Sequence, residues 1–170
     1  AECSAPVWSP DGGRLIYESR PRRSGLLDSP RLHWLDADTG ETLPLVEGNE
    51  TPGYGARFSP DGRWLSYVSL ADDGVVLYQM AGGAQRLLSS RVGSPAAWSP
   101  DSAAVVYGDL VVQGHATAPD VEGALDALPV QESSTVFLYR TMVGEETTRQ
   151  RLSPDAAVAD SAPAFSPDGE

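Results

Sequence analysis

Four copies of one short motif, an aromatic residue followed by Ser-Pro-Asp, constrain the fold of this chain more than any other feature. The copies are Trp8-Ser9-Pro10-Asp11-Gly12, Phe58-Ser59-Pro60-Asp61-Gly62, Trp98-Ser99-Pro100-Asp101-Ser102 and Phe165-Ser166-Pro167-Asp168-Gly169. Their serines stand at positions 9, 59, 99 and 166, so the spacings are 50, 40 and 67 residues. Recurring self-similarity is the signature of repeat architectures, so the chain is predicted to be an array of similar units.

Each motif has the chemistry of a tight turn between two strands. Pro presets φ at the second turn position, Asp suits the third, and Gly takes the positive φ that closes a hairpin with a bulge. Ser102 replaces that Gly in the third copy, which we expect to cost on the order of 1 kcal/mol. The aromatic residues Trp8, Phe58, Trp98 and Phe165 are predicted to be core wedges between neighbouring sheets. Asp11, Asp61, Asp101 and Asp168 recur once per unit and are predicted to be structural.

Each of the first three motifs begins a series of four predicted strands. The second strands end near a tyrosine, at residues 14–17, 63–67 and 103–107; third strands follow at 31–35, 75–80 and 135–140, and fourth strands at 42–46, 84–88 and 148–152. Four antiparallel strands per period of about 40–50 residues is the blade pattern of a propeller. The predicted fold is therefore all-β, a β-propeller segment of about three four-stranded antiparallel blades plus the first strand of a fourth. The blades are expected near residues 5–48, 54–90 and 94–153, with an insertion at 108–134 and the next blade starting at 161–170.

These residues resemble the TolB-like β-propeller repeat, a bacterial relative of the WD-type repeat, over nearly the whole chain. They also resemble the propeller domains of prolyl oligopeptidase-type and tricorn-type peptidases. The departures are Ser102 and the insertion at 108–134. The resemblance implies an interaction scaffold in the periplasm, on the cell surface or secreted, although no signal sequence is visible in this segment.

The number of blades predicts an open structure. Propellers typically need 4–8 blades to close, and three leave apolar faces and strand edges open. We therefore expect a segment of a larger ring, packed against the remaining blades of the same chain. The alternative is a short chain that assembles with copies of itself. Expressed alone, the segment is expected to be poorly soluble or oligomeric.

Composition excludes several classes of partner. The net charge is −12, from 24 acidic and 12 basic residues, which would repel nucleic acid over most of the surface. Cys3 is the single cysteine, so neither an internal disulfide nor a cysteine-based metal site is expected. No apolar run approaches the roughly 20 residues of a membrane helix, so no membrane insertion is predicted within this segment.

No catalytic, cofactor or metal site is predicted from the motifs present. The segment Asp36-Ala37-Asp38-Thr39-Gly40 suggests a calcium loop but lacks an oxygen ligand and the closing Glu, so we interpret it as a hairpin turn. His33 and His115 lack the spacing of a metal site. The chain contains no Gly-x-Ser-x-Gly elbow, phosphate loop or dinucleotide fingerprint.

A binding face is predicted on the rim opposite the motif turns, where the connecting loops vary in length. Within 108–134, residues 119–129 are predicted either to form two helical turns as a lid or to be a plain surface excursion. The arginine-rich first loop is expected to grip an acidic partner, to pair with acidic loops, or to be solvated. The candidate binding residues are Arg20, Arg22, Arg23, Tyr54, Arg91, His115, Asp120 and Glu122.

Three functions remain open at this point. The first is a non-catalytic scaffold that binds a protein or peptide of unknown identity outside the cytoplasm. The second is the propeller domain that controls substrate access in a larger serine peptidase. The third is the extracytoplasmic sensor domain of a membrane-anchored regulator.

Overall fold

The computed structural model describes residues 2–45, 52–115, 131–144, 148–154 and 162–169. All regular elements within these ranges are β-strands. They include no helix with the length and apolar character needed to cross a membrane. The all-β prediction is therefore confirmed for the part of the chain that the structure describes.

The strands form three four-stranded antiparallel sheets, which we call blades 1, 2 and 3. Blade 1 contains β1 (Glu2–Trp8), β2 (Arg14–Arg20), β5 (Arg31–Asp36) and β6 (Thr42–Pro44); blade 2 contains β7 (Gly53–Phe58), β8 (Trp64–Ser69), β9 (Gly74–Gln79) and β10 (Gln85–Ser89); blade 3 contains β11 (Ala97–Trp98), β12 (Ala104–His115), β13 (Gln131–Met142) and β14 (Arg149–Arg151). A small hairpin of β3 (Arg22–Arg23) and β4 (Leu26–Leu27) extends from blade 1. The strands of each blade pair in chain order, as a propeller blade requires.

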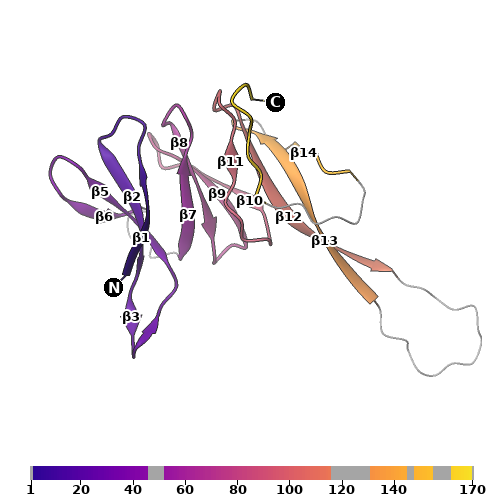
Figure 1. Cartoon of the computed structure of the whole chain (residues 1–170), viewed down its shortest axis with the longest axis horizontal. Coiled ribbons are helices and arrows are strands. Elements are labelled where there is room, and N and C mark those ends of the chain that lie inside the picture. The colour runs from indigo at the N-terminus through magenta and orange to yellow at the C-terminus, as the bar shows by residue number, and fades with distance from the viewer. Residues whose placement is uncertain (1, 46–51, 116–130, 145–147, 155–161, 170) are drawn as a thin grey trace, which may run out of the picture.

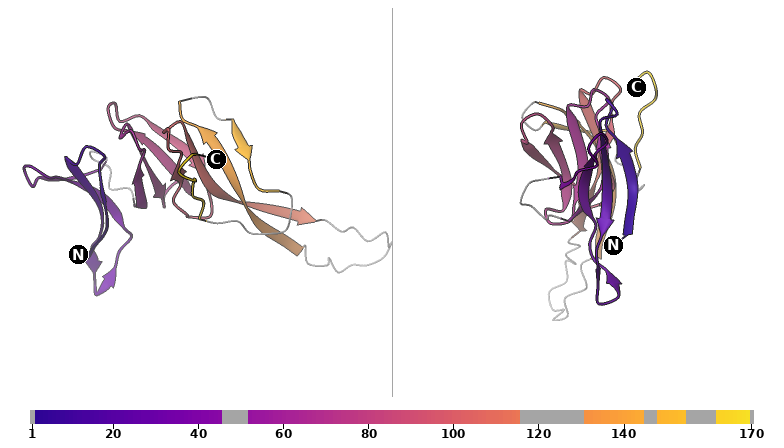
Figure 2. Two further views of the ribbon diagram at one scale, coloured as in Figure 1. Left: turned by 45° about the horizontal axis from the view of Figure 1, so that its top comes forward. Right: turned by 90° about the vertical axis from the view of Figure 1, so that its left-hand side faces the viewer.

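The blades stand side by side in chain order, and their faces pack against one another (Figures 1 and 2). Two apolar clusters fill the spaces between them. The first joins Ile16, Leu32 and Leu45 of blade 1 to Ala56, Leu65, Tyr67 and Val76 of blade 2. The second joins Val75, Leu77 and Leu88 of blade 2 to Ala96, Val105, Tyr107, Phe137 and Tyr139 of blade 3. The core is thus divided into two similar blade-to-blade interfaces.

Strand alternation gives each blade two apolar faces. Successive residues of a strand point to opposite sides of the sheet, so Leu65 and Tyr67 of β8 face blade 1 while Trp64 packs toward blade 3. We call the face directed toward the preceding blade the front face and the other the rear face. The front faces share a motif aromatic, an aliphatic residue and a tyrosine: Trp8, Leu15 and Tyr17; Phe58, Leu65 and Tyr67; Trp98, Val105 and Tyr107.

The motif turns are held together by their serine side chains, as the turn chemistry predicts. The Ser9 hydroxyl donates to Asp11 Oδ1 at 2.5 Å and accepts the Arg14 backbone N–H at 2.9 Å. The same pair of contacts recurs around Ser59, at 2.6 and 3.0 Å, and around Ser99, at 2.6 and 2.9 Å. The contacts of each motif serine are therefore made within its own turn.

Ser102 links two turns as well as closing its own. Its φ of 62° lies in the left-handed region that favours glycine. The side chain is buried, and its hydroxyl oxygen accepts the backbone N–H of Asp61 at 3.0 Å from the turn of blade 2. This hydrogen bond offsets part of the backbone strain that the sequence predicts here.

The structure corrects the sequence prediction for one motif aromatic. Trp8, predicted to be a core residue, is 58% exposed. Blade 1 is the first blade of the row (Figure 1), and among the described residues its front face is not packed against another blade. Phe58 and Trp98 are partly buried against the two clusters, as predicted. Phe165 is partly buried, but residues 162–169 are not assigned as a strand, so the first strand predicted for a fourth blade is not formed as such.

Both flanking strands extend into the insertion predicted at 108–134. β12 and β13 pair continuously from Ala104 opposite Met142 to His115 opposite Gln131. They extend well beyond the other strands, at the lower right of Figure 1. The helical interpretation of residues 119–129 falls outside the described residues.

Candidate binding groove

The residue before each motif aromatic contributes to one surface of the molecule, which is formed by the first strands of the blades. The strands β1, β7 and β11 are the first strand of each blade, and this position holds Val7, Arg57 and Ala97 there, with Ala164 in the C-terminal segment. Two surface hollows are built around these side chains. The first strands therefore converge on one surface, although they come from different blades.

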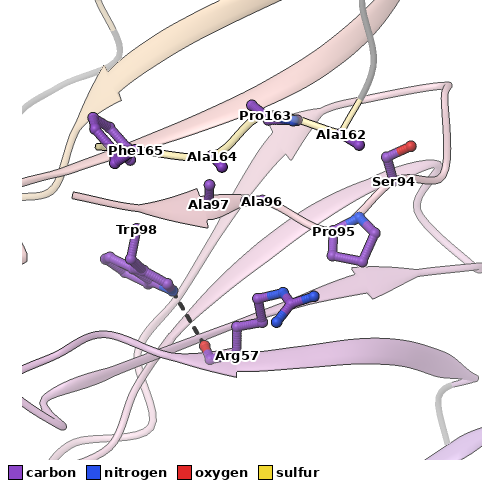
Figure 3. A pocket seen from close by; sticks show the side chains of 10 residues that line it. All are labelled: Arg57, Ser94, Pro95, Ala96, Ala97, Trp98, Ala162, Pro163, Ala164 and Phe165. Atoms are coloured by element: carbon purple, nitrogen blue, oxygen red, sulfur yellow. Dashed lines mark hydrogen bonds between the residues drawn. The ribbon is translucent and has the colours of Figure 1, made fainter. Parts of the chain in front are cut away.

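The larger hollow, which we call the groove, has a volume of about 500 Å³. It lies between β7, β11 and the C-terminal segment, with the Arg57 side chain directed toward Pro95 (Figure 3). Its ten lining residues are Arg57, Ser94, Pro95, Ala96, Ala97, Trp98, Ala162, Pro163, Ala164 and Phe165. Arg57 is the charged residue among these ten, and Ser94 is the residue with a side-chain hydroxyl, so the lining is mostly apolar with one positive charge.

Trp98 fixes the floor of the groove through contacts with blade 2. Its indole N–H is shared between the Arg57 carbonyl at 3.2 Å and Ser66 Oγ at 3.0 Å. The Ser66 hydroxyl is fully buried and also donates to the Arg57 carbonyl, at 3.4 Å. The backbone that carries Arg57 is therefore held by two donors, while the Arg57 residue itself is exposed.

A second hollow of about 310 Å³ adjoins the groove and shares Arg57 and Trp98 with it. It continues toward blade 1 through Phe58, Val7 and Trp8. An arginine surrounded by apolar and aromatic side chains can pair bidentately with a carboxylate, while the neighbouring rings and prolines contact apolar side chains. This arrangement suits an extended chain that carries an acidic group.

The arginines of the predicted binding face are placed among acidic side chains. Arg22 Nη2 lies 2.5 Å from Glu2 Oε1, and both side chains are about half exposed. Arg20 Nη2 lies 3.9 Å from Glu18 Oε2, and Glu18 Oε1 accepts the Gly55 backbone N–H at 2.9 Å. Arg23 is exposed on β3. Arg20 and Arg22 thus lie beside glutamates of β2 and β1, whereas the sequence interpretation named acidic loops as the partners.

Tyr54 and Arg91, also predicted for the binding face, make structural contacts. The Tyr54 hydroxyl donates to the Gly93 carbonyl at 2.5 Å, which joins β7 to the loop before blade 3. The Arg91 backbone N–H donates to Asp109 Oδ1 at 3.2 Å, and its guanidinium donates to the Leu110 carbonyl. Both residues tie the loop that precedes β11 to its surroundings.

The remaining predicted binding residues lie in or beyond the long hairpin. His115 is the last residue of β12. Asp120 and Glu122 fall outside the described residues. The structure thus brings Arg20, Arg22 and Arg23 together near β3 and places Tyr54 and Arg91 near the junction of blades 2 and 3. Of the predicted residues that the structure describes, these two groups lie apart and do not form one site.

The motif aspartates accept hydrogen bonds within their own turns. Burial acts to raise the pKa of Asp61, but hydrogen bonds from Ser59 and from the backbone and side chain of Arg63 outweigh it and lower the pKa to about 2. Hydrogen bonds from the serine and from a backbone N–H likewise lower the pKa of Asp11 and Asp101. No group of three or more His, Cys, Asp or Glu with the geometry of a metal site occurs among the described residues.

The segment around Asp36 is a hairpin turn, as the sequence interpretation favours. Asp36 Oδ1 accepts the Thr39 backbone N–H at 2.8 Å and the Thr39 hydroxyl at 2.9 Å. His33 packs within blade 1, where its ring stacks on Tyr17 with centroids 5.8 Å apart and its Nδ1 lies 3.1 Å from Ser19 Oγ.

The groove was not predicted from the sequence. The sequence signal that could have indicated it is the contrast between Arg57 and the small or aliphatic residues at the same motif position.

Comparisons with known proteins support the fold alone. No protein-family model matches the chain, and no curated protein sequence does. Among solved structures, TolB from Acinetobacter baumannii aligns over 99% of this chain with a TM-score of 0.61 and 18% identity. The putative TolB from Agrobacterium tumefaciens aligns over 85% with a TM-score of 0.51 and 22% identity. Acylaminoacyl peptidase from Pyrococcus horikoshii aligns over 88% with a TM-score of 0.55 and 10% identity.

The chain spans only part of each of these proteins. It covers 36% of the Acinetobacter TolB chain, 46% of the Agrobacterium protein and 24% of the Pyrococcus peptidase. The chain is structurally similar to the TolB β-propeller and to the propeller domains of acylaminoacyl peptidases, as the motif resemblance implied.

Proposed function

We propose that this chain is a non-catalytic propeller scaffold that binds an extended peptide segment of a protein partner in the groove. The observation that carries the proposal is a hollow of about 500 Å³ whose lining combines Trp98, Phe165 and two prolines with one exposed arginine. Ligand sites are typically concave and largely apolar, with a few polar groups that fix orientation. The groove has this composition.

The chemistry of the groove favours a partner segment with an acidic group beside apolar residues. The chain carries a net charge of −12, so long-range electrostatics disfavour a strongly acidic partner. A single carboxylate opposite Arg57, flanked by apolar side chains, satisfies both conditions. The partner is therefore an extended peptide with one acidic anchor rather than a polyanion.

A peptide library tests this proposal. Random peptides displayed on phage are selected against the immobilised chain, and binding of the selected peptides is measured by fluorescence anisotropy. Ala97→Trp, which fills the groove, should abolish binding, and Arg57→Glu should weaken it at least tenfold. Arg23→Ala, on the predicted loop rim, serves as the matched control. Unchanged binding by Ala97→Trp together with lost binding by Arg23→Ala would move the site to the loop rim and contradict the groove.

The substrate-access domain of a larger serine peptidase is the second candidate function. The alignment with the acylaminoacyl peptidase of Pyrococcus horikoshii favours it. The reading frame beyond Glu170 discriminates the two: a Gly-x-Ser-x-Gly elbow followed by Asp and His supports the peptidase, and further blades followed by a stop codon support the scaffold. A membrane-spanning helix upstream would instead support a sensor domain of a membrane-anchored regulator.

An extracytoplasmic location is part of the proposal. It rests on the resemblance of the motifs to the TolB-like repeat and on the alignment with TolB structures. Recovery of the native protein in the periplasmic or surface fraction of its host is the expected result, and recovery with cytoplasmic enzymes would contradict it.

A further inference from the structure

The hairpin of β12 and β13 continues past the strands that flank it. β11 pairs with β12 at residues 105–106, and β14 pairs with β13 at residues 139–141. β12 and β13 themselves stay paired over their whole length. Residues 108–115 and 131–138 thus form a two-stranded ribbon, at the lower right of Figure 1, and no third strand runs along it among the described residues.

Alternate residues of the ribbon direct their backbone groups away from the opposite strand. Leu138 of β13 does so, because its N–H donates to Ser153 Oγ at 2.8 Å and its carbonyl accepts the Leu152 N–H at 2.8 Å. With a period of two, Val136 and Ser134 present their N–H and C=O groups at the same edge. Within the part of the chain that the structure describes, these outward groups have no hydrogen-bond partner.

The opposite edge of the ribbon, on β12, is covered next to the blade. The Ser90 hydroxyl donates to the Gly108 carbonyl at 2.6 Å, and the Arg91 guanidinium donates to the Leu110 carbonyl. Side chains that cover an edge in this way prevent another strand from pairing there. Leu110 lies opposite Val136, so β13 is open at a level where β12 is still covered.

The open edge of β13 does not result from the position of blade 3 in the row. Neighbouring blades pack through the side chains on their faces, whereas the edge of a strand points sideways within its own sheet. The ribbon also extends beyond the other strands of the row (Figures 1 and 2). A blade packed on the rear face of blade 3 therefore does not supply the missing neighbour of β13.

The side chains beside this edge favour an extended apolar segment. Leu110 and Val136 lie opposite each other on one face of the ribbon, and Val112 opposite Ser134 follows on the same face. Val112 is 44% exposed. A strand added to β13 would place alternate side chains beside Val136 and extend this row. The net charge of −12 disfavours an acidic segment.

We infer that the edge of β13 at Ser134 and Val136 binds an extended segment of a partner protein, which adds to the ribbon as a third strand. The added strand lies on the same side of β13 as β14 and continues its line. Main-chain hydrogen bonds provide the affinity, and alternate side chains provide the specificity. The segment has apolar residues at alternate positions and no net negative charge. This site is separate from the groove, which takes a segment with an acidic anchor beside Arg57.

Peptides selected from a displayed random library on the full chain are the probe, and their binding is measured by fluorescence anisotropy. Val136→Pro removes an outward N–H that takes no part in pairing with β12, so it should weaken edge-bound peptides by about tenfold or more. Val112→Pro, the same change at the edge of β12, is the matched control and should leave their affinity unchanged. Ala97→Trp, which fills the groove, should also leave it unchanged.

Amide hydrogen exchange followed by NMR locates the bound strand. In the free chain the amides of Ser134 and Val136 should exchange rapidly, while that of Thr135, which faces β12, should exchange slowly. Edge-bound peptides should slow the exchange of Ser134 and Val136. Far-ultraviolet circular dichroism of each variant confirms that the blades remain folded.

The outcomes separate this site from the groove. A selection that yields no peptide weakened by Val136→Pro would overturn the inference, whether or not it yields groove peptides weakened by Ala97→Trp. Equal weakening by Val136→Pro and Val112→Pro would place the binding on a face of the ribbon instead of the β13 edge. Association of the chain with itself that Val136→Pro abolishes would assign the edge to a second copy and contradict a partner protein as its occupant.

Discussion

Trp8 and Trp98 occupy the same position of the same motif, at opposite ends of the row of blades, and have different environments. Trp98 packs against the cluster between blades 2 and 3 and shares its indole N–H between two acceptors of blade 2. Trp8 is 58% exposed. Their turns are alike, because Ser9 and Ser99 make the same hydrogen bonds.

The difference shows which interactions of the repeat are made within one blade and which are made between neighbouring blades. The hydrogen bonds of the motif serines are made within one blade, whereas the aromatic side chain is buried by the blade before it. In repeat proteins, stability is approximately a sum of intrinsic terms and nearest-neighbour interface terms. Substitutions in the two regions should therefore separate these terms.

The largest expected difference is between the two tryptophans themselves. Trp98→Ala should lower the free energy of unfolding by about 3 kcal/mol, since it removes a large side chain from an interface together with its hydrogen bonds. Trp8→Ala should cost less than about 1 kcal/mol because its side chain is largely in solvent. Urea unfolding under monomeric conditions measures both, and equal losses would contradict the difference in burial.

Leu88 and Leu152, on the rear faces of blades 2 and 3, should also differ in their contribution to stability, here with the exposed residue in the last blade of the row. Leu88→Ala creates a cavity between blades 2 and 3 and should cost about 2–4 kcal/mol. Leu152→Ala, at the equivalent position of blade 3, should cost less than about 1 kcal/mol. Urea midpoints of the two variants check this, and a Leu152→Ala loss as large as that of Leu88→Ala would show that this face is already covered.

The motif serines should behave alike at both ends. Ser9→Ala and Ser99→Ala each remove a hydroxyl that donates to an aspartate and accepts a backbone N–H, so each should cost about 1–2 kcal/mol. Thermal unfolding of the two variants, compared at one protein concentration, is the measurement. A clearly larger loss at Ser99 would mean that the turn depends on its neighbouring blade.

Glycine and serine at the fourth turn position offer a finer comparison. Gly12→Ser places a side chain at φ 72° in the first blade of the row and should cost about 1 kcal/mol. Ser102→Ala keeps the strained φ but loses the hydrogen bond from Asp61, which should also cost about 1 kcal/mol. Ser102→Gly should be nearly neutral in urea unfolding, because relief of strain balances the lost bond. A strong loss on Ser102→Gly would give the inter-turn bond a larger role.

A separate effect is expected on the pH dependence of stability. The pKa of Asp61 in the folded chain is about 2, below its ordinary value of 3.8. The folded state therefore binds this proton less readily than the unfolded state, and the stabilisation is present above about pH 4 and lost as the pH falls toward 2. Urea midpoints between pH 5 and pH 2 should fall less steeply for Asp61→Asn. Parallel curves would contradict the lowered pKa.

Much of the architecture follows from local sequence. The Ser-Pro-Asp turns, the tyrosine-ended strands and the order of four strands per blade depend on contacts within a few residues, and they were predicted. The exposure of Trp8 was not, because burial at that position depends on a neighbouring blade rather than on the motif. The twelve-residue strand β13 was underestimated because the polar residues 131–134 at its start resemble a loop in composition.

The candidate site could be predicted from the sequence less well than the fold. Tyr54 and Arg91 are predicted for a binding face because they lie in variable loops. The structure adds that they form hydrogen bonds to Gly93, Asp109 and Leu110, and such distant pairings leave no local signal. The groove forms where separate strands converge, so only the unusual Arg57 marked it. A repeat pattern predicts which positions are equivalent, and the contacts between blades decide which of them are free.

Fluorine NMR of the chain labelled with 5-fluorotryptophan tests most directly whether the neighbouring blade determines burial of the motif aromatic. The four tryptophan resonances are assigned with single Trp→Phe variants, and their shifts are compared in H2O and D2O under monomeric conditions. The largest solvent isotope shift is expected for Trp8 and a clearly smaller one for Trp98. Equal shifts for the two residues, or a larger shift for Trp98, would contradict the proposed division between local turns and shared interfaces.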